Sequence, residues 1–177
     1  VAELQHQDGI ARYALEFLIL CASRTSEVLQ ATWSEIDLKK GVWTIPKERM
    51  KAGIEHRVPL SKRALAILKL VQPFSSETHV FPGGKKDKPL SNMAMSMLLR
   101  RMGYDAITVH GFRSTFRNWA GEQTNYPFEV CEQALAHRLP DAVAAAYLRS
   151  DFFERRASLL ADWATYCQSK CLTSTVA

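Results

Sequence analysis

The stretch that decides the fold is Glu35–Leu60, EIDLKKGVWTIPKERMKAGIEHRVPL, where the apolar pattern changes from a helical period to a strand period. Glu35–Leu38 and Val42–Ile45 predict two short strands around a glycine-containing turn, and His56–Leu60 predicts a third. Pro59 indicates an edge strand or a strand end, because proline donates no backbone hydrogen bond. We therefore expect a small, three-stranded antiparallel sheet.

Helical patterns flank this stretch on both sides. Residues 8–23 place apolar side chains at intervals of three and four, which predicts an amphipathic helix that faces a core. Further helices are expected at 26–32, 61–71, 91–99, 110–123, 127–135, 141–148 and 151–168. Ser61 and Ser91 are expected to cap two of them, and Pro127 to lie in a first turn. The expected fold class is mainly α with a small three-stranded antiparallel β-sheet (α+β).

Length and composition limit the class of protein. With 177 residues, of which 47% are hydrophobic, the chain can bury one core, which excludes a disordered or collagen-like protein. The formal net charge of +5 favours an anionic partner. The longest apolar run, Ala14–Ala22, is too short to span a membrane, and the first residues do not form a secretory signal. We therefore expect a soluble, cytoplasmic protein with no membrane partner.

The cysteines and carboxylates predict no metal site. Cys21, Cys131, Cys167 and Cys171 form no C-x-x-C pair and have no histidine partner at zinc-finger spacing. We expect them to be reduced thiols, because the spacing does not indicate a disulfide framework. No carboxylate cluster suited to two metal ions is visible, which argues against a hydrolytic, metal-dependent nuclease.

Cations and imidazoles are concentrated in four short segments that lie far apart in the chain. Arg24 follows directly on the first apolar helix, where its charge is expected at the edge of the core. His110 and Arg113 are three positions apart, so on a helix they project from one face and can bind one anion together. Arginine suits this task because its planar fork binds two phosphate oxygens and keeps its charge. The ordinary alternative is a set of surface or ion-paired residues, with Arg24 paired to Glu27.

Taken in order, these segments resemble the signature of the tyrosine recombinases, particularly the phage and genomic-island integrases. The matching residues are Arg24 within R-T-S-E, Lys51 in a hairpin turn, His110-x-x-Arg113, Leu135-Ala136-His137, and Tyr147 ten positions later. The resemblance covers roughly Asp8–Cys167. Two departures are small: the family more often has Gly-Leu where this chain has Ala22-Ser23, and glycine where it has Ala136.

The resemblance implies cleavage and rejoining of DNA through a covalent 3′-phosphotyrosine, with no metal and no nucleotide cofactor. Tyr147 would be the nucleophile. Arg24 and Arg113 would stabilise the negative charge that develops at the phosphorus. Lys51 would protonate the leaving 5′-oxygen.

The remaining residues have supporting roles under the same resemblance. His110 would accept the tyrosine proton, and His137 would donate a hydrogen bond to the phosphate. Glu27 would orient Arg24. Lys47 and Arg49 are rivals of Lys51, because a basic turn is often only a solvated, DNA-facing patch. Tyr13, Tyr104, Tyr126 and Tyr166 are rivals of Tyr147, with packing as their ordinary role.

The resemblance also implies partners and domain organisation. Residues 1–177 are expected to form a single catalytic domain, the C-terminal fragment of a longer integrase without its N-terminal DNA-binding part, since the chain starts at Val1 rather than Met. The implied partner is duplex DNA at attachment sites, bound by a homotetramer; the isolated domain as a monomer, and the host element (phage, prophage or island), stay open. Two other functions also stay open: DNA relaxation by a type IB topoisomerase, and DNA binding without catalysis.

Overall fold

The structure is a computed structural model, and it describes residues 1–75, 78–137 and 151–169. In this part of the chain the elements are η1 (Ala2–His6), α1 (Ile10–Cys21), α2 (Thr25–Leu29), η2 (Trp33–Glu35), β1 (Ile36–Asp37), β2 (Val42–Ile45), η3 (Lys47–Arg49), β3 (His56–Pro59), α3 (Lys62–Val71), η4 (Gln72–Phe74), α4 (Ala94–Arg101), α5 (Gly111–Gln123), α6 (Phe128–Ala134) and α8 (Phe153–Gln168). The expected fold class is confirmed.

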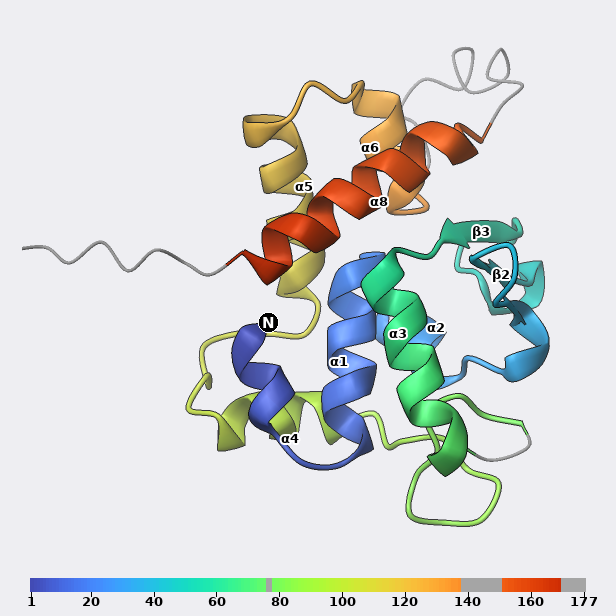
Figure 1. Cartoon of the computed structure of the whole chain (residues 1–177), viewed down its shortest axis with the longest axis vertical. Helices are drawn as coiled ribbons and strands as arrows, with labels where there is room; N and C mark the ends of the chain where they lie inside the picture. Colours follow the sequence, from blue (N-terminus) through green and yellow to red (C-terminus); the bar gives the residue numbers. More distant parts are fainter. Residues whose placement is uncertain (76–77, 138–150, 170–177) are drawn as a thin grey trace, which may run out of the picture.

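Helix α1 is the centre of the molecule and contacts α2, α3, α4 and α8 (Figure 1). Every residue from position 14 to 21 is buried. The expectation of a helix with a single buried face is therefore wrong, because neighbouring helices surround α1 on several sides. The buried carboxylate of Glu16 is tolerated there because the Arg63 guanidinium binds both of its oxygens, at 2.7 and 2.8 Å.

The three-stranded antiparallel sheet is confirmed, with the strand order β1-β2-β3. Trp43 of β2 pairs with Ile36 on one side and with Val58 on the other. The Trp43 ring is buried and packs on Phe17 of α1, with 5.4 Å between the ring centroids. The sheet is therefore fixed to the central helix through an aromatic contact.

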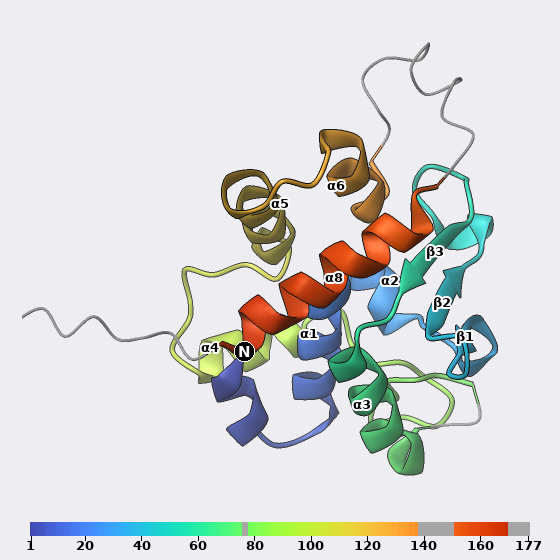
Figure 2. The same cartoon turned by 45° about the horizontal axis from the view of Figure 1, so that its top comes forward.

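Helices α5, α6 and α8 form a second group above α1, and α8 crosses between the α5–α6 pair and the sheet (Figure 2). Their shared core is aromatic: Trp163 of α8 contacts Phe116 and Trp119 of α5, with ring centroids 5.5 and 5.0 Å apart. The Trp163 indole also donates a hydrogen bond to the Ile19 carbonyl at 2.8 Å. This bond fixes α8 to α1, so the two helical groups meet in one core.

The expected helix caps are confirmed at one helix start and not at another. The cap at Ser61 is confirmed, because its hydroxyl oxygen accepts the Ala64 N–H at 3.3 Å. The cap at Ser91 is wrong: α4 begins at Ala94, after a turn in which the Ser91 carbonyl accepts the Ala94 N–H. Leu90 is held in extended pairing with Phe81, which delays the helix. The helix expected at 141–148 lies outside the described residues.

Two further findings concern the described ranges alone. None of their helices has both the length and the apolar character that a membrane crossing requires. Cys21, Cys131 and Cys167 form no disulfide with one another, and Cys171 lies outside the described residues.

Candidate active site

Arg24 lies at the junction between α1 and α2. Helix α1 ends at Cys21, and the left-handed backbone of the next residue, Ala22 (φ 49°), turns the chain. Arg24 then adopts an extended conformation before α2. The Glu27 carboxylate accepts the backbone N–H of Arg24 at 2.8 Å and the Arg24 guanidinium at 2.7 Å. Because Glu27 is 3% exposed, this pair holds Arg24 in one orientation.

Arg113 is buried in the first turn of α5 and reaches the same junction. Its guanidinium donates hydrogen bonds to the Ala22 carbonyl and, at 2.7 Å, to the Leu135 carbonyl. Burial, and then the positive charge of the nearby Arg24, lower the pKa of Arg113 to about 10. Arg113 is therefore still a cation at neutral pH, held close to a second cation.

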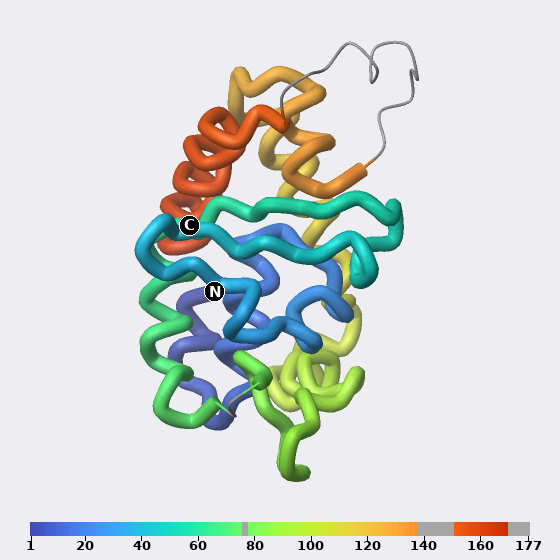
Figure 3. Tube along the Cα trace, turned by 90° about the vertical axis from the view of Figure 1, so that its right-hand side faces the viewer, coloured from blue at the N-terminus to red at the C-terminus, as the bar shows by residue number. Residues whose placement is uncertain are grey.

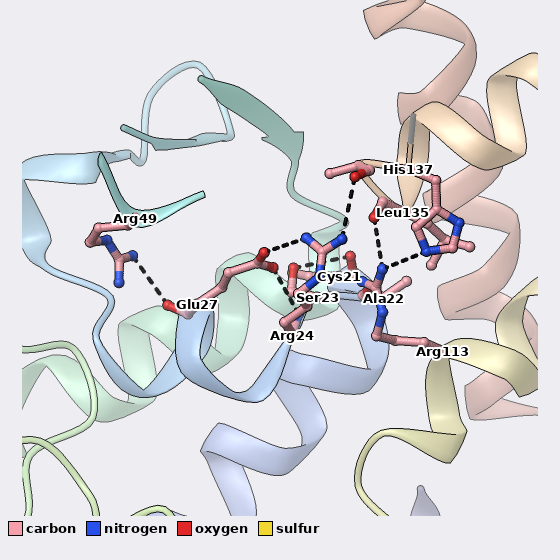
Figure 4. Close-up of polar contacts among 10 residues, drawn as sticks. Cys21, Ala22, Ser23, Arg24, Glu27, Arg49, Arg113, Leu135 and His137 are labelled. Carbon is pink, nitrogen blue, oxygen red and sulfur yellow. Dashed lines mark hydrogen bonds and ion pairs between the residues drawn. The ribbon is translucent and has the colours of Figure 1, made fainter. Parts of the chain in front are cut away.

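The chain after α6 supplies the acceptors that bring the two arginines together (Figure 4). Arg113 binds the Leu135 carbonyl, and Arg24 binds the next carbonyl, that of Ala136, at 3.3 Å. Ala136 has a left-handed backbone with φ 49°. This turn places the two carbonyls beside the two guanidinium groups.

His137 follows in the same turn and links Arg113 to a carboxylate. Its Nε2 atom lies 3.1 Å from Arg113 Nη2, and its Nδ1 atom lies 2.8 Å from Glu132 Oε2. Since the guanidinium can only donate, Nε2 accepts and Nδ1 carries the proton that Glu132 accepts. Burial raises the pKa of Glu132, but hydrogen bonds from Arg117 and His137 outweigh it and hold that pKa below its ordinary value.

Lys51 shares an open pocket of about 420 Å³ with this cluster; the lining residues are Arg24, Lys51, Ala52, Ala136 and His137. Lys51 is exposed in the turn between β2 and β3, and the buried Met50 fixes the turn beside it. Figure 3 shows this turn next to the end of α6. Two cations and an imidazole therefore face one space, which suits a phosphate.

Three of the six candidate residues are not among the described residues that line this pocket. Arg113 is buried and contacts the lining residue His137, with 3.1 Å between Arg113 Nη2 and His137 Nε2. His110 lies exposed at the start of α5, three positions before Arg113, and is not among the lining residues. Tyr147 lies outside the described residues. The four rival tyrosines are described, and all of them have contacts elsewhere: Tyr13 with Arg12, Tyr104 with Glu3, Tyr126 with Asp162 and Tyr166 with Trp163.

A comparison with known families gives a clear result. Residues 2–154 match the sequence model of the phage integrase family. The chain belongs to this family. The prophage integrase IntA of Escherichia coli K12 is 38% identical over 149 residues, which are 82% of this chain and 36% of that protein. The integrase of Enterobacteria phage P4 is 32% identical over 175 residues, 89% of this chain and 40% of that protein.

Solved structures of integrases share the fold of this phage integrase family member. The integrase from mycobacterium phage Brujita has a TM-score of 0.61 at 18% identity, covering 89% of this chain and 53% of that one. A lambda integrase dimer bound to a core site has a TM-score of 0.57 at 20% identity, covering 84% and 44%. The chain spans less than half of the length of the curated relatives named above.

The structure adds residues that the sequence pattern did not assign to the site of this integrase-family chain. Burial, followed by the charges of Arg156, Arg24 and Arg113, lowers the pKa of His56 to about 3, and a hydrogen bond joins His56 to the Ala134 backbone. His56 is thus a neutral imidazole, close enough to both site arginines for their charges to act on it. Its one sequence signal was its place on the strand that follows the Lys51 turn. The sequence did not indicate a role for Glu132, because its contact with His137 depends on the turn after α6.

Proposed function

We propose that the protein is a tyrosine recombinase that carries out site-specific DNA recombination, with residues 1–177 as one catalytic domain. The observation that carries the proposal is the convergence of Arg24 and Arg113 on consecutive carbonyls. Arg24 lines a pocket together with Lys51 and His137, and the buried Arg113 contacts His137 at 3.1 Å. Membership of the phage integrase family supports the same reaction. The relatives named as prophage and phage integrases favour recombination over DNA relaxation.

The proposed cleavage step balances without a cofactor. The Tyr147 hydroxyl oxygen attacks the scissile phosphorus and forms a 3′-phosphotyrosine bond while the bond to the 5′-oxygen breaks. His110 takes the phenolic proton, and Lys51 gives a proton to the 5′-oxygen, which leaves as a hydroxyl. Because the phosphotyrosine keeps the energy of the phosphodiester, a 5′-hydroxyl of another strand can reverse the step without ATP.

Arg24 and Arg113 act on the non-bridging oxygens, where the transition state gathers negative charge. Both are fixed by hydrogen bonds before substrate arrives, so little reorganisation is needed. His137 requires one change: its Nε2 atom accepts from Arg113, and it must take up a proton before it can donate to a phosphate oxygen.

The proposed partner is duplex DNA at attachment sites, bound by a tetramer of the full recombinase in the cytoplasm. Two of the solved structures with this fold are of lambda integrase on DNA, one a dimer bound to a core site and one a tetramer bound to a Holliday junction. The formal charge of +5 suits contacts with phosphates, which weaken as salt increases.

A trapping experiment tests the proposal. The purified protein is incubated with a library of nicked duplexes whose cleaved strand loses its short 5′-hydroxyl fragment, with EDTA present, and covalent adducts are recovered and sequenced. We expect an adduct at Tyr147, none with Tyr147→Phe, and a normal yield with Tyr166→Phe as the matched control.

Each other outcome contradicts the proposal in a defined way. DNA binding without any adduct indicates a non-catalytic binding protein. An adduct at another tyrosine shows that this tyrosine, and not Tyr147, is the nucleophile. Relaxation of supercoiled DNA without strand exchange between paired sites indicates a topoisomerase.

A further inference from the structure

The turn that carries Lys51 has little structure of its own. Between β2 and β3 the backbone makes short-range hydrogen bonds, from Arg49 to Pro46, from Met50 to Lys47 and from Gly53 to Met50. Lys51 itself is exposed. These local bonds define the shape of the turn, and the buried Met50 side chain packs it on the core. A polar connection from the turn to α2, beside Arg24, comes from another side chain.

The side chain of Arg49 supplies that connection. Arg49 Nη2 lies 2.8 Å from Glu35 Oε2 and 3.2 Å from the carbonyl oxygen of Glu27 (Figure 4 draws the second contact). Glu35 is itself held by the Trp43 indole at 2.9 Å. Arg49 therefore joins the Lys51 turn to β2 and to α2 at the same time.

The contact with Glu27 matters because Glu27 binds two arginines. Its backbone carbonyl accepts from Arg49, and its carboxylate accepts from Arg24. The same residue thus anchors the turn of Lys51 and orients Arg24 at the pocket. A shift of Arg49 would move Lys51 relative to Arg24 without breaking the pair of Arg24 with Glu27.

Arg49 is an unfavourable residue at this position if its only role is to stabilise the fold. Its side chain is 17% exposed, and its Nε and Nη1 atoms are buried with no hydrogen-bond partner among the described residues. Buried donors without partners are unfavourable. One nitrogen of the guanidinium, Nη2, nevertheless donates to both Glu35 and the Glu27 carbonyl, so this single group joins the turn to β2 and to α2.

We propose that Arg49 is a positioning residue that locks the β2–β3 turn against α2 and so delivers the Lys51 ammonium to the leaving oxygen. The inference rests on the proposed general-acid role of Lys51. It also removes Arg49 as a rival of Lys51, since the Arg49 guanidinium points into the protein.

The test compares two DNA substrates that differ in one atom. A duplex with sulfur in place of the 5′-bridging oxygen needs no general acid, because a thiolate leaves without a proton. Cleavage of this duplex and of the ordinary duplex, both built on the sequence recovered from trapped adducts, is measured for Arg49→Lys, Arg49→Ala and Lys51→Ala. Lys47→Ala is the matched control, since Lys47 is an exposed cation in the same turn.

We expect Arg49→Lys and Arg49→Ala to cleave the ordinary duplex about 10-fold to 100-fold more slowly and the thio duplex at nearly the wild-type rate, as Lys51→Ala does. Amide hydrogen exchange in residues 47–55 rises in both Arg49 variants and not in Lys51→Ala or Lys47→Ala. Thermal melting temperatures of all variants are measured, to show that the slower cleavage and faster exchange do not come from unfolding of the protein.

The outcomes distinguish this inference from the proposed function. One outcome overturns only the positioning role of Arg49. In it, the thio duplex restores cleavage by Lys51→Ala, but the Arg49 variants lose the same cleavage rate on both duplexes. Wild-type rates in both Arg49 variants also overturn it. If Lys51→Ala is not rescued by sulfur, the general-acid role and the inference both fail.

Discussion

Arg24 and Arg113 donate to two consecutive carbonyl oxygens, Arg24 to Ala136 and Arg113 to Leu135. The two arginines come from helices far apart in the sequence, and the turn after α6 brings them together. Their proximity is unfavourable in itself, since the charge of Arg24 contributes to the lowered pKa of Arg113. Such a pair is stabilised by anything negative placed between the guanidinium groups, which is what a scissile phosphate supplies.

The left-handed turn at Ala136 predicts a stabilising substitution. A left-handed backbone costs an L-residue roughly 1–2 kcal/mol, and glycine avoids this at an entropic cost of roughly 0.5–1 kcal/mol. We expect Ala136→Gly to raise the free energy of unfolding by up to about 1 kcal/mol, measured by urea denaturation. The matched control is Ala161→Gly in exposed, right-handed α8, which we expect to lower it by about 1 kcal/mol. Equal losses in both variants would show that the turn is not strained.

His56 predicts a pH dependence of stability. Its pKa is lowered to about 3 by burial and by Arg156, Arg24 and Arg113, whereas an unfolded histidine has a pKa of about 6.5. Between these values the unfolded chain binds the extra proton, so stability falls as the pH falls below about 6.5. We expect wild type to lose roughly 1 kcal/mol per pH unit relative to His56→Gln between pH 6 and 4.5. Parallel curves from urea denaturation would refute a neutral, largely desolvated His56.

Glu132 predicts a change in His137 without a change in fold. Its carboxylate accepts from His137 Nδ1 at 2.8 Å and from Arg117 Nε at 2.5 Å. Glu132→Gln keeps the shape but removes the charge that favours a protonated imidazole. We expect the ring-proton NMR signals of His137 to shift and DNA cleavage to slow by about 10-fold. The half-buried Glu129→Gln on the same helix is the control, and unchanged His137 signals in Glu132→Gln would contradict the pairing.

The sequence predicted the sheet and most helices, because these depend on local periodicity. It also put forward the candidate cations, of which Arg24 and Lys51 line one pocket. It missed what depends on distant contacts. The full burial of α1 follows from neighbours that lie far along the chain, and the delayed start of α4 follows from the pairing of Leu90 with Phe81. Arg49 was an open rival of Lys51, since only the packed structure shows its side chain bound to Glu35 and Glu27.

The two alanines illustrate the same limit. Ala22 and Ala136 stand where the resembling family more often has glycine, and from the sequence both substitutions are merely small. The structure gives both a left-handed backbone, and their carbonyls accept from Arg113 and Arg24. Two substitutions that look neutral therefore lie at the turns that assemble the site.

The central claim is that Arg24 and Arg113 neutralise the charge of one scissile phosphate. The most direct measurement compares cleavage of a phosphate duplex with that of a methylphosphonate duplex, in which one charged oxygen is replaced by a neutral methyl group. We predict that Arg24→Ala and Arg113→Lys lose on the order of 100-fold or more, about 3 kcal/mol, on the phosphate and far less on the methylphosphonate, with DNA binding retained. Equal losses on the two substrates would contradict the account.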